Sequence, residues 1–219
     1  MKIMIGTPTY DGKLDVHYNE SLINTCIQGL KLGLEIIPFY IAYDALIQRA
    51  RNDIFKIAYH YNVDCLFFID ADIGWDPDNF FKLVLNQNHI VGGTYRKKTD
   101  NEELYVLKIK DNEQEISIEQ NLIEVQGLGM GFTKIDNYAI KKIWENSEKY
   151  VEDNIEKANV FFVEIKDNTI ISEDIVFCNN WINLDEKIYL DSSITCNHTG
   201  IKTFYGNFEN WIAQNFNDK

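Results

Sequence analysis

The first hundred residues alternate between short apolar runs and stretches in which apolar residues recur every three or four positions. The apolar runs predict buried strands at residues 2–6, 36–41, 64–70 and 89–92. The helical spacing predicts helices at 19–32, 44–61 and 77–86, the last capped by Asp76 with Pro77 in its first turn. Strand–helix alternation of this kind is typical of a parallel α/β sheet.

The pattern changes after residue 100. Alternating polar and apolar residues predict antiparallel hairpins, built from residues 104–110 and 116–125. Further along, the pattern predicts helices at 137–147 and 172–183 and a strand at 188–194, and the aromatic tail 203–216 is predicted to pack as a closing helix. The polar stretch 146–157 is predicted to be a loop. Because the sequence contains no repeat, low-complexity tract or linker, we expect one domain.

Composition narrows the class of protein. The chain has 219 residues, of which 45% are hydrophobic and 25% charged, as in soluble globular domains. Its net charge of -13 argues against a nucleic-acid partner, although a metal ion could screen the charge of a nucleotide ligand. Apolar runs are too short for a signal peptide or a membrane span, so we expect a cytoplasmic location, in the host cytoplasm if the protein is viral. We expect buried free thiols at all four cysteines, namely Cys26, Cys65, Cys178 and Cys196.

Two aspartates, Asp70 and Asp72, follow the third predicted strand. Ligands of open α/β sheets bind beyond the carboxyl ends of the strands, and a one-residue spacing on an extended backbone directs both side chains to the same side. Converging carboxylates repel each other unless a cation separates them, and Mn²⁺ and Mg²⁺ commonly bridge carboxylates to phosphates. The pair therefore predicts a Mn²⁺ or Mg²⁺ site. The alternative is a solvated turn in which Asp72 caps the next helix.

Seven segments occur in an order and spacing that match a known family over residues 1–205. They are residues 7–10 (Thr-Pro-Thr-Tyr), 49–52 (Arg-Ala-Arg-Asn), 68–73 (Phe-Ile-Asp-Ala-Asp-Ile), 91–95 (Val-Gly-Gly-Thr-Tyr), 129–132 (Gly-Met-Gly-Phe), 172–178 (Ser-Glu-Asp-Ile-Val-Phe-Cys) and 190–200. With these segments the chain resembles the GT-A glycosyltransferases that use nucleotide-sugars, most closely the small glycosyltransferases of phages and large DNA viruses. One departure is Asn197-His198-Thr199, which stands where a His-Val pair is more usual.

The resemblance implies an α/β fold of the GT-A type (nucleotide-diphospho-sugar transferase, Rossmann-like), with a mixed sheet flanked by helices and a small antiparallel addition. Residues 1–219 would form a single GT-A glycosyltransferase domain, with a nucleotide-binding half at 1–100 and a half for the donor sugar and acceptor at 101–219. The implied activity is metal-dependent transfer of a hexosyl group from a nucleotide-diphosphate sugar to a hydroxyl of a glycan or glycoprotein acceptor. A UDP-sugar donor is preferred over a GDP-sugar.

The same resemblance assigns residues to the donor. The expected donor-binding residues are Thr7, Pro8, Tyr10, Arg51, Asp70, Ala71, Asp72 and Gly129. Tyr10 would stack on the base, or would be only an aromatic side chain at the rim. Arg51 would donate hydrogen bonds to ribose or phosphate, or would form a surface salt bridge. Gly129 would allow the donor sugar to approach closely, and no Gly-Lys-Ser/Thr follows it to make a phosphate loop.

Metal binding and catalysis are expected at the acid pair and at two later segments. Asp72 would bind the metal directly, His198 would be a further ligand, and Asp70 would contact the ribose or reach the metal through water. The metal would neutralise charge on the leaving nucleoside diphosphate. Glu173 and Asp174 either interact favourably with a helix dipole or supply the base that takes the proton of the acceptor hydroxyl. The resemblance favours Asp174 as this base. A base in this position implies that the configuration of the anomeric carbon is inverted rather than retained.

Two other readings stay open. A haloacid-dehalogenase-like phosphatase also uses Asp-x-Asp after an apolar strand, but that strand is usually the first of the chain, and here other strands and helices precede it. A catalytically inactive nucleotide-sugar-binding protein would not need the full set of Asp70, Asp72, Asp174 and His198. The basic run at residues 96–98 either contacts the acceptor or diphosphate, or is a solvated turn.

Overall fold

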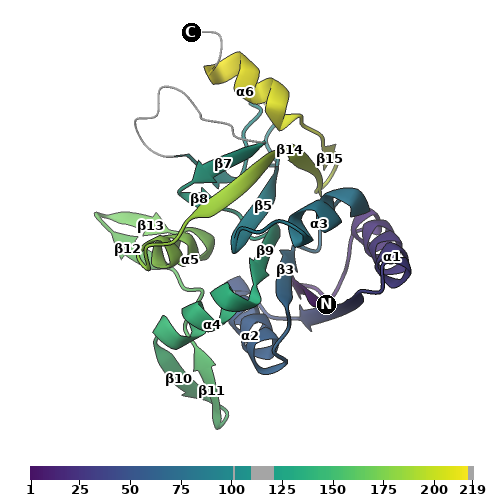
Figure 1. Cartoon of the computed structure of the whole chain (residues 1–219). Coiled ribbons are helices and arrows are strands. Elements are labelled where there is room, and N and C mark those ends of the chain that lie inside the picture. Colours follow the sequence, from purple (N-terminus) through teal and green to yellow (C-terminus); the bar gives the residue numbers. More distant parts are fainter. Residues whose placement is uncertain (101, 110–120, 217–219) are drawn as a thin grey trace.

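The computed structural model describes residues 1–100, 102–109 and 121–216, and its centre is a mixed sheet (Figure 1). The strands of the sheet run in the order β15-β14-β5-β9-β3-β1-β2. Their bounds are β1 Lys2–Thr9, β2 Glu35–Ala42, β3 Cys65–Ile69, β5 Ile90–Tyr95, β9 Phe132–Asp136, β14 Ile188–Thr199 and β15 Thr203–Phe204. Two short strands, β4 (Ile73–Gly74) and β7 (Leu122–Val125), also pair with β14.

The sheet is mixed because one central strand runs against its neighbours. β1 is parallel to β2 and β3, as the alternation of strands and helices predicts, and β5 is also parallel to β14. β9 lies between β3 and β5 and is antiparallel to both. The strand–helix alternation of the first hundred residues does not predict this antiparallel strand. The mixed α/β architecture with flanking helices and small antiparallel sheets is confirmed.

Helices cover both faces of this sheet (Figure 1). Their bounds are α1 Val16–Lys31, α2 Ile47–His60, α3 Pro77–Val84, α4 Asn137–Asn146, α5 Glu173–Ile182 and α6 Phe208–Phe216. α2 begins three residues later than predicted, because Leu46 has an extended backbone and its N–H donates to Asp44 Oδ1 at 2.9 Å. Asp76 caps α3 as predicted, accepting from the N–H of Asp78.

Alternating side chains of the strands separate two cores. On β1 and β3, Met4 and Phe68 face a core that includes Ile54 of α2 and Phe177 of α5. Neighbouring strand residues face the other core, which they share with buried residues of α1 and α3. This division follows from the two-residue period of a strand, and it puts α2 and α5 on the same face of the sheet.

Within the described residues, three small antiparallel pairs lie outside the main sheet. They are β10 (Lys149–Glu152) with β11 (Ile155–Ala158), β12 (Glu164–Lys166) with β13 (Thr169–Ile171), and β6 (Leu107–Lys108) with β8 (Gly127–Leu128). The first pair corrects the predicted loop at 146–157. Its turn is made by Asp153 and Asn154, with φ of 52° and 61°, the backbone that tight hairpins require.

The predictions for the second half need three further corrections. β7 pairs with β14 rather than with the stretch 104–110, and part of the predicted hairpin region, 110–120, lies outside the described residues. β14 runs to residue 199, beyond the predicted end at 194. The predicted closing helix at 203–216 is the strand β15 followed by α6.

The remaining sequence expectations concern thiols and membranes. All four cysteines are free; Cys65, Cys178 and Cys196 are buried, and Cys26 is half-buried. Burial raises the pKa of Cys65 and of Cys178 to about 12, so these thiols stay protonated and unreactive near neutral pH. None of the helices formed by the described residues is long and apolar enough to cross a bilayer.

Candidate functional site

The segment from Asp70 to Asp72 is a turn held by hydrogen bonds to three parts of the chain. Ile73 N–H donates to Asp70 O at 3.0 Å, which closes the turn after β3. Asp70 N–H donates to the carbonyl of Gly131 just before β9, and the carbonyl of Ala71 accepts from the N-cap residue of α1. The carbonyl of Asp72 accepts from the last residue of β14 at 2.9 Å. Because the backbone turns here, the two carboxylates have different partners.

Asp70 belongs to a buried ion-pair network centred on Arg51. Arg51 lies on α2 and is only 3% exposed. Its Nη2 donates to Asp70 Oδ1 at 3.0 Å, and its Nη1 donates to Glu173 Oε1 at 2.6 Å. Burial lowers the pKa of Arg51, but the charges of Asp70 and Glu173 outweigh burial and raise it, so the guanidinium stays charged. Arg51 therefore forms a buried network rather than a surface salt bridge, and it ties the end of β3 to the start of α5.

Two glycines leave room for a buried tyrosine beside Asp70. A Cβ at Gly131 would lie 2.5 Å from the Tyr95 hydroxyl and 2.9 Å from Asp70 Oδ2, and a Cβ at Gly129 would lie 2.5 Å from the same hydroxyl. Gly131 N–H donates to that hydroxyl at 3.1 Å. Burial, with the charge of Asp70, raises the pKa of Tyr95 well above its ordinary value, so it stays neutral. The absence of a side chain at Gly129 thus makes room for the Tyr95 hydroxyl. Contact of Gly129 with a donor sugar stays a prediction.

Asp72 lies beside Lys98 and His198. Lys98 Nζ is 2.5 Å and His198 Nε2 is 3.7 Å from Asp72 Oδ2. Burial raises the pKa of Asp72, but the hydrogen bonds and charges of His198 and Lys98 lower it more, to below its ordinary value. The structure therefore brings together Asp72, His198 and one lysine of the basic run 96–98.

The orientation of His198 leaves Nε2 facing Asp72. His198 Nδ1 lies 2.8 Å from the carbonyl oxygen of Arg96. Because a carbonyl can only accept, Nδ1 carries the hydrogen of this bond, and in the neutral imidazole Nε2 then keeps its lone pair. Metal-binding histidines are usually oriented in this way, through a hydrogen bond from the other ring nitrogen to a carbonyl or carboxylate.

Asp72 and His198 have the spacing of two ligands of one cation. Metal–ligand distances of about 2.0–2.2 Å put neighbouring ligand atoms about 3–4 Å apart, and the separation of Oδ2 and Nε2 is 3.7 Å. In the part of the chain that the structure describes, no group of three or more His, Cys, Asp or Glu side chains is placed to hold a metal. The carboxylate of Asp70 is engaged by Arg51 instead. The two side chains thus fit a divalent cation that takes its other ligands from a bound molecule or from water.

Exposed tyrosine side chains follow β1 and β2 at the same edge of the sheet. Thr7 and Pro8 are buried in β1, and Thr7 Oγ1 is hydrogen bonded to the hydroxyl of Tyr18 at 2.6 Å. Tyr10, just beyond β1, is 76% exposed. Tyr43, just beyond β2, is 80% exposed, and no motif in the sequence marks it as a binding residue. The tyrosines at the ends of β1 and β2 are thus accessible to a planar ligand, whereas the side chain of Thr7 is used inside the protein.

Glu173 and Asp174 begin α5 and differ in their contacts. The Glu173 side chain is 13% exposed and bonded to Arg51. Asp174 is half-buried, and its Oδ1 accepts from the hydroxyl of Ser172 and from the N–H of Ile175. Helix-start stabilisation therefore accounts for part of the role of both acids. The pairing of Glu173 with Arg51 joins residues 122 positions apart, and no local signal in the sequence predicts it.

The comparisons with known proteins bear on the fold alone. No family model and no curated protein matches the sequence. A solved structure described as "Crystal Structure of A197 from STIV" is 20% identical with a TM-score of 0.57, over 91% of this chain and 86% of that one. A glycosyltransferase involved in the glycosylation of the major capsid of PBCV-1 is 10% identical with a TM-score of 0.36, over 66% of each chain. The inositol-1-phosphate CTP transferase from T. maritima is 10% identical with a TM-score of 0.42, over 85% of this chain and 84% of that one.

The last two similarities are too weak to support an argument. The first covers most of both chains, but at this identity it carries no information on activity. The chain therefore shares its overall fold with A197 from STIV.

Proposed function

We propose that the protein is a metal-dependent glycosyltransferase that moves a sugar from a nucleotide-diphosphate sugar to a hydroxyl of a glycan or glycoprotein. The observation that carries the proposal is the Asp72–His198 pair, with 3.7 Å between Oδ2 and Nε2, at the carboxyl end of β3. Ligand sites of open α/β sheets lie at this edge. The sequence resemblance to GT-A glycosyltransferases supports the proposal, because it assigns Asp72 and His198 to the metal that would bind the donor.

The donor would extend from the aromatic first loop to the acid pair. Tyr10 is exposed and would stack on the base of the nucleotide. The proposed donor is a UDP-sugar in preference to a GDP-sugar. Asp72 and His198 would hold Mn²⁺ or Mg²⁺, which supplies positive charge to the diphosphate as it leaves. The ammonium group of Lys98 would move from Asp72 to the diphosphate when the cation binds. Arg51, fixed by Asp70 and Glu173, would hold the β3 turn and the start of α5 in register.

The transfer step then uses an acid at the start of α5. The oxygen of the acceptor hydroxyl forms a bond to the anomeric carbon, while the bond from that carbon to the diphosphate oxygen breaks. The hydroxyl proton passes to the carboxylate of Asp174, and the nucleoside diphosphate leaves with the bonding electrons. Asp174 suits this role better than Glu173, because Arg51 already binds the Glu173 carboxylate. Attack from the side opposite the leaving group inverts the anomeric centre.

The rival activities are less well supported by the contacts. A haloacid-dehalogenase-like phosphatase would use Asp70 as its nucleophile. Both carboxylate oxygens of Asp70 lie within 3.3 Å of Arg51 Nη2, so this carboxylate is already engaged in an ion pair. A catalytically inactive nucleotide-sugar-binding protein would bind the donor in the same place. It differs from an enzyme only in turnover, so an activity measurement decides between them.

Binding of the donor is tested by thermal unfolding with a panel of UDP- and GDP-sugars, with and without Mn²⁺. A ligand present at 100 times its Kd adds about 2.7 kcal/mol to the free energy of unfolding. For a domain of this size that raises Tm by roughly 5–10 °C. Asp72→Asn should remove the part of this increase in Tm that depends on Mn²⁺. Asp185→Asn should not remove it; Asp185 is exposed, and its φ of 61° is one that Asn tolerates. If no nucleotide-sugar stabilises the protein in a metal-dependent way, the proposal fails.

A further inference from the structure

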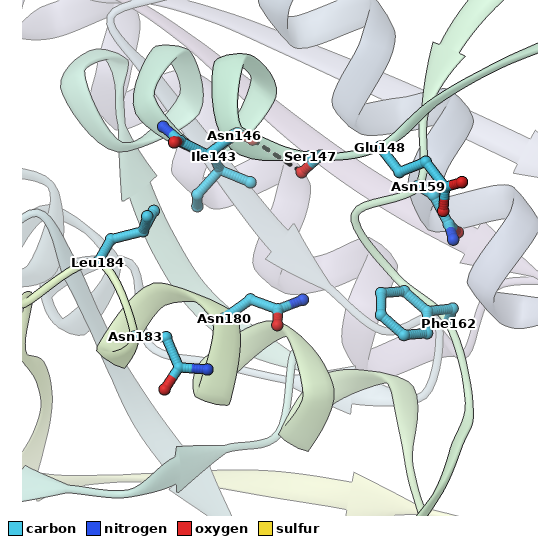
Figure 2. Close-up of a pocket in the computed structure, with 9 residues that line it drawn as sticks. All are labelled: Ile143, Asn146, Ser147, Glu148, Asn159, Phe162, Asn180, Asn183 and Leu184. Atoms are coloured by element: carbon cyan, nitrogen blue, oxygen red, sulfur yellow. Dashed lines mark hydrogen bonds between the residues drawn. The ribbon is translucent and has the colours of Figure 1, made fainter.

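A cavity of about 290 Å³ lies between α4, α5 and the segment that follows β11 (Figure 2). It lies on the face of the sheet that α2, α4 and α5 cover, and its lining does not include Asp72 or His198. Its main lining residues are Ile143, Asn159, Phe162, Asn180, Asn183 and Leu184. Figure 2 shows Asn180 pointing toward the ring of Phe162, with the aliphatic side chains of Ile143 and Leu184 also in the lining. Nothing in the proposed transfer reaction uses this cavity.

Three carboxamides in the lining make no hydrogen bond to the described part of the protein. They belong to Asn159, Asn180 and Asn183. By contrast, the amide of Asn146 donates to Lys142 O at 2.8 Å. Each carboxamide offers one acceptor and two donors, so these three, of which Asn180 and Asn183 are exposed, give the cavity a high density of hydrogen-bonding groups that a ligand can reach. Such groups suit a ligand with several adjacent polar atoms.

The apolar part of the lining suits a ring with one apolar face. Ile143, Leu184 and Phe162 supply aliphatic and aromatic surface next to the carboxamides. A pyranose matches this mixture, because its hydroxyls surround a ring whose faces present C–H groups. A carboxamide can accept from one hydroxyl and donate to its neighbour. Among the described residues that line the cavity, Glu148 alone is charged, so a neutral sugar fits better than an acidic one.

The cavity is connected to the candidate active site through rigid elements. α5 starts at Glu173 and reaches Asn180 seven residues later, about 10 Å along the helix axis. The wall that contains Phe162 is fixed to α2 by Asn52, whose Nδ2 donates to Phe161 O at 2.9 Å and whose Oδ1 accepts from Phe161 N–H at 2.8 Å. Asn52 directly follows Arg51, so both sides of the cavity are tied to the network that holds the start of α5.

We infer that this cavity, which we name the α4–α5 cavity, binds a neutral sugar residue of the acceptor. The assignment to the acceptor rests on the proposed glycosyltransferase function; the assignment to a neutral sugar rests on the lining alone. The cavity would hold a part of the glycan at a distance from the hydroxyl that reacts. It would then select acceptors by a sugar that is not itself modified.

The test is an NMR titration of the full chain with methyl glycosides of glucose, galactose, mannose and N-acetylglucosamine, without donor. At least one glycoside should shift the side-chain amide signals of Asn180 and Asn183 saturably. The double variant Asn180→Ala/Asn183→Ala should bind that glycoside about tenfold or more weakly, since it loses two sets of hydrogen bonds. Asn210→Ala, at an exposed position of α6, is the matched control and should bind it as the wild type does.

The outcomes separate this inference from the proposed function. No shift with any of the four glycosides, or unchanged affinity in the double variant, would overturn the sugar site. Since both asparagines are exposed, the double variant should fold, and Asn180→Ala alone provides a milder version of the same test. The Asp72→Asn variant should lose metal-dependent donor binding yet keep glycoside binding. Glycoside binding by a protein that turns over no nucleotide-sugar would support the sugar site and overturn its assignment to an acceptor.

Discussion

Replacement of Arg51 by methionine tests the buried network most severely. Met keeps an unbranched apolar stem as far as the position of Nε and removes the rest of the guanidinium, so Asp70 and Glu173 lose their shared partner. Their side chains are 24% and 13% exposed, so water restores only part of what is lost. Breaking a buried ion pair by removing one partner costs about 3–5 kcal/mol. With the partial exposure of both acids, we expect the lower end of that range.

A loss of about 3 kcal/mol is large for a domain whose total stability is roughly 5–15 kcal/mol. It corresponds to a decrease in Tm of roughly 6–12 °C for a chain of this length. Urea unfolding monitored by tryptophan fluorescence measures it directly. Arg49→Met is the matched control, two positions earlier in α2. The Arg49 side chain is 45% exposed, and Asp44 keeps the N–H of Leu46 as a partner when Arg49 is replaced, so the control should move the midpoint less than Arg51→Met does.

One further variant identifies the cause. Adding Asp70→Asn and Glu173→Gln to Arg51→Met removes the unpaired charges and should recover a large part of the lost stability. If Arg51→Met destabilises no more than Arg49→Met, the network does not hold β3 and α5 together and the reasoning is refuted.

The other predictions concern the Asp72 side of the site. Lys98→Met should tighten Mn²⁺ binding, measured by electron paramagnetic resonance, because the ammonium group competes with the metal for Asp72; weaker binding would show that Lys98 does not compete. Carboxyl-carbon NMR should show the pKa of Asp72 below its ordinary value in the wild type and higher in Lys98→Met. The lowered pKa stabilises the folded protein at pH values above the ordinary pKa of an aspartate, and this stabilisation is lost as the pH falls through the lowered pKa. An unchanged pKa would exclude the ion pair. Asp174→Asn should keep donor affinity by calorimetry and lose transfer, and retained transfer would remove Asp174 as the base.

Much of the first half of the fold could be predicted because its signals are local. The apolar run before Asp70 and the cap at Asp76 depend on neighbours in the sequence, and the structure has the strand and helix they predict. The apolar spacing of α1 predicted the helix but not its buried face. Ile23 and Ile27 are exposed, whereas Thr25 is buried and its hydroxyl accepts from Trp75 Nε1. Tertiary hydrogen bonds thus decided which side of this helix faces the core.

The site could be predicted only in part, because its contacts join distant segments. The acid pair and His198 were singled out from the sequence, and the structure places Asp72 next to His198. The partner of Asp70 is Arg51, which had been expected to contact the donor. The antiparallel strand β9 was missed for a similar reason. Its short run after the glycines has no helix before it to mark a crossover, and only pairing with β3 and β5 defines it.

The most direct test of the central claim is release of nucleoside diphosphate from a nucleotide-sugar. Water can replace the acceptor hydroxyl, so the measurement does not require the natural acceptor. With Mn²⁺ and a UDP- or GDP-sugar, the wild type should release the nucleoside diphosphate and free sugar, faster when a glycan acceptor is added. Asp72→Asn should release neither above background. Metal-dependent donor binding with no release, with or without glycans, would contradict the claim and identify a nucleotide-sugar-binding protein instead.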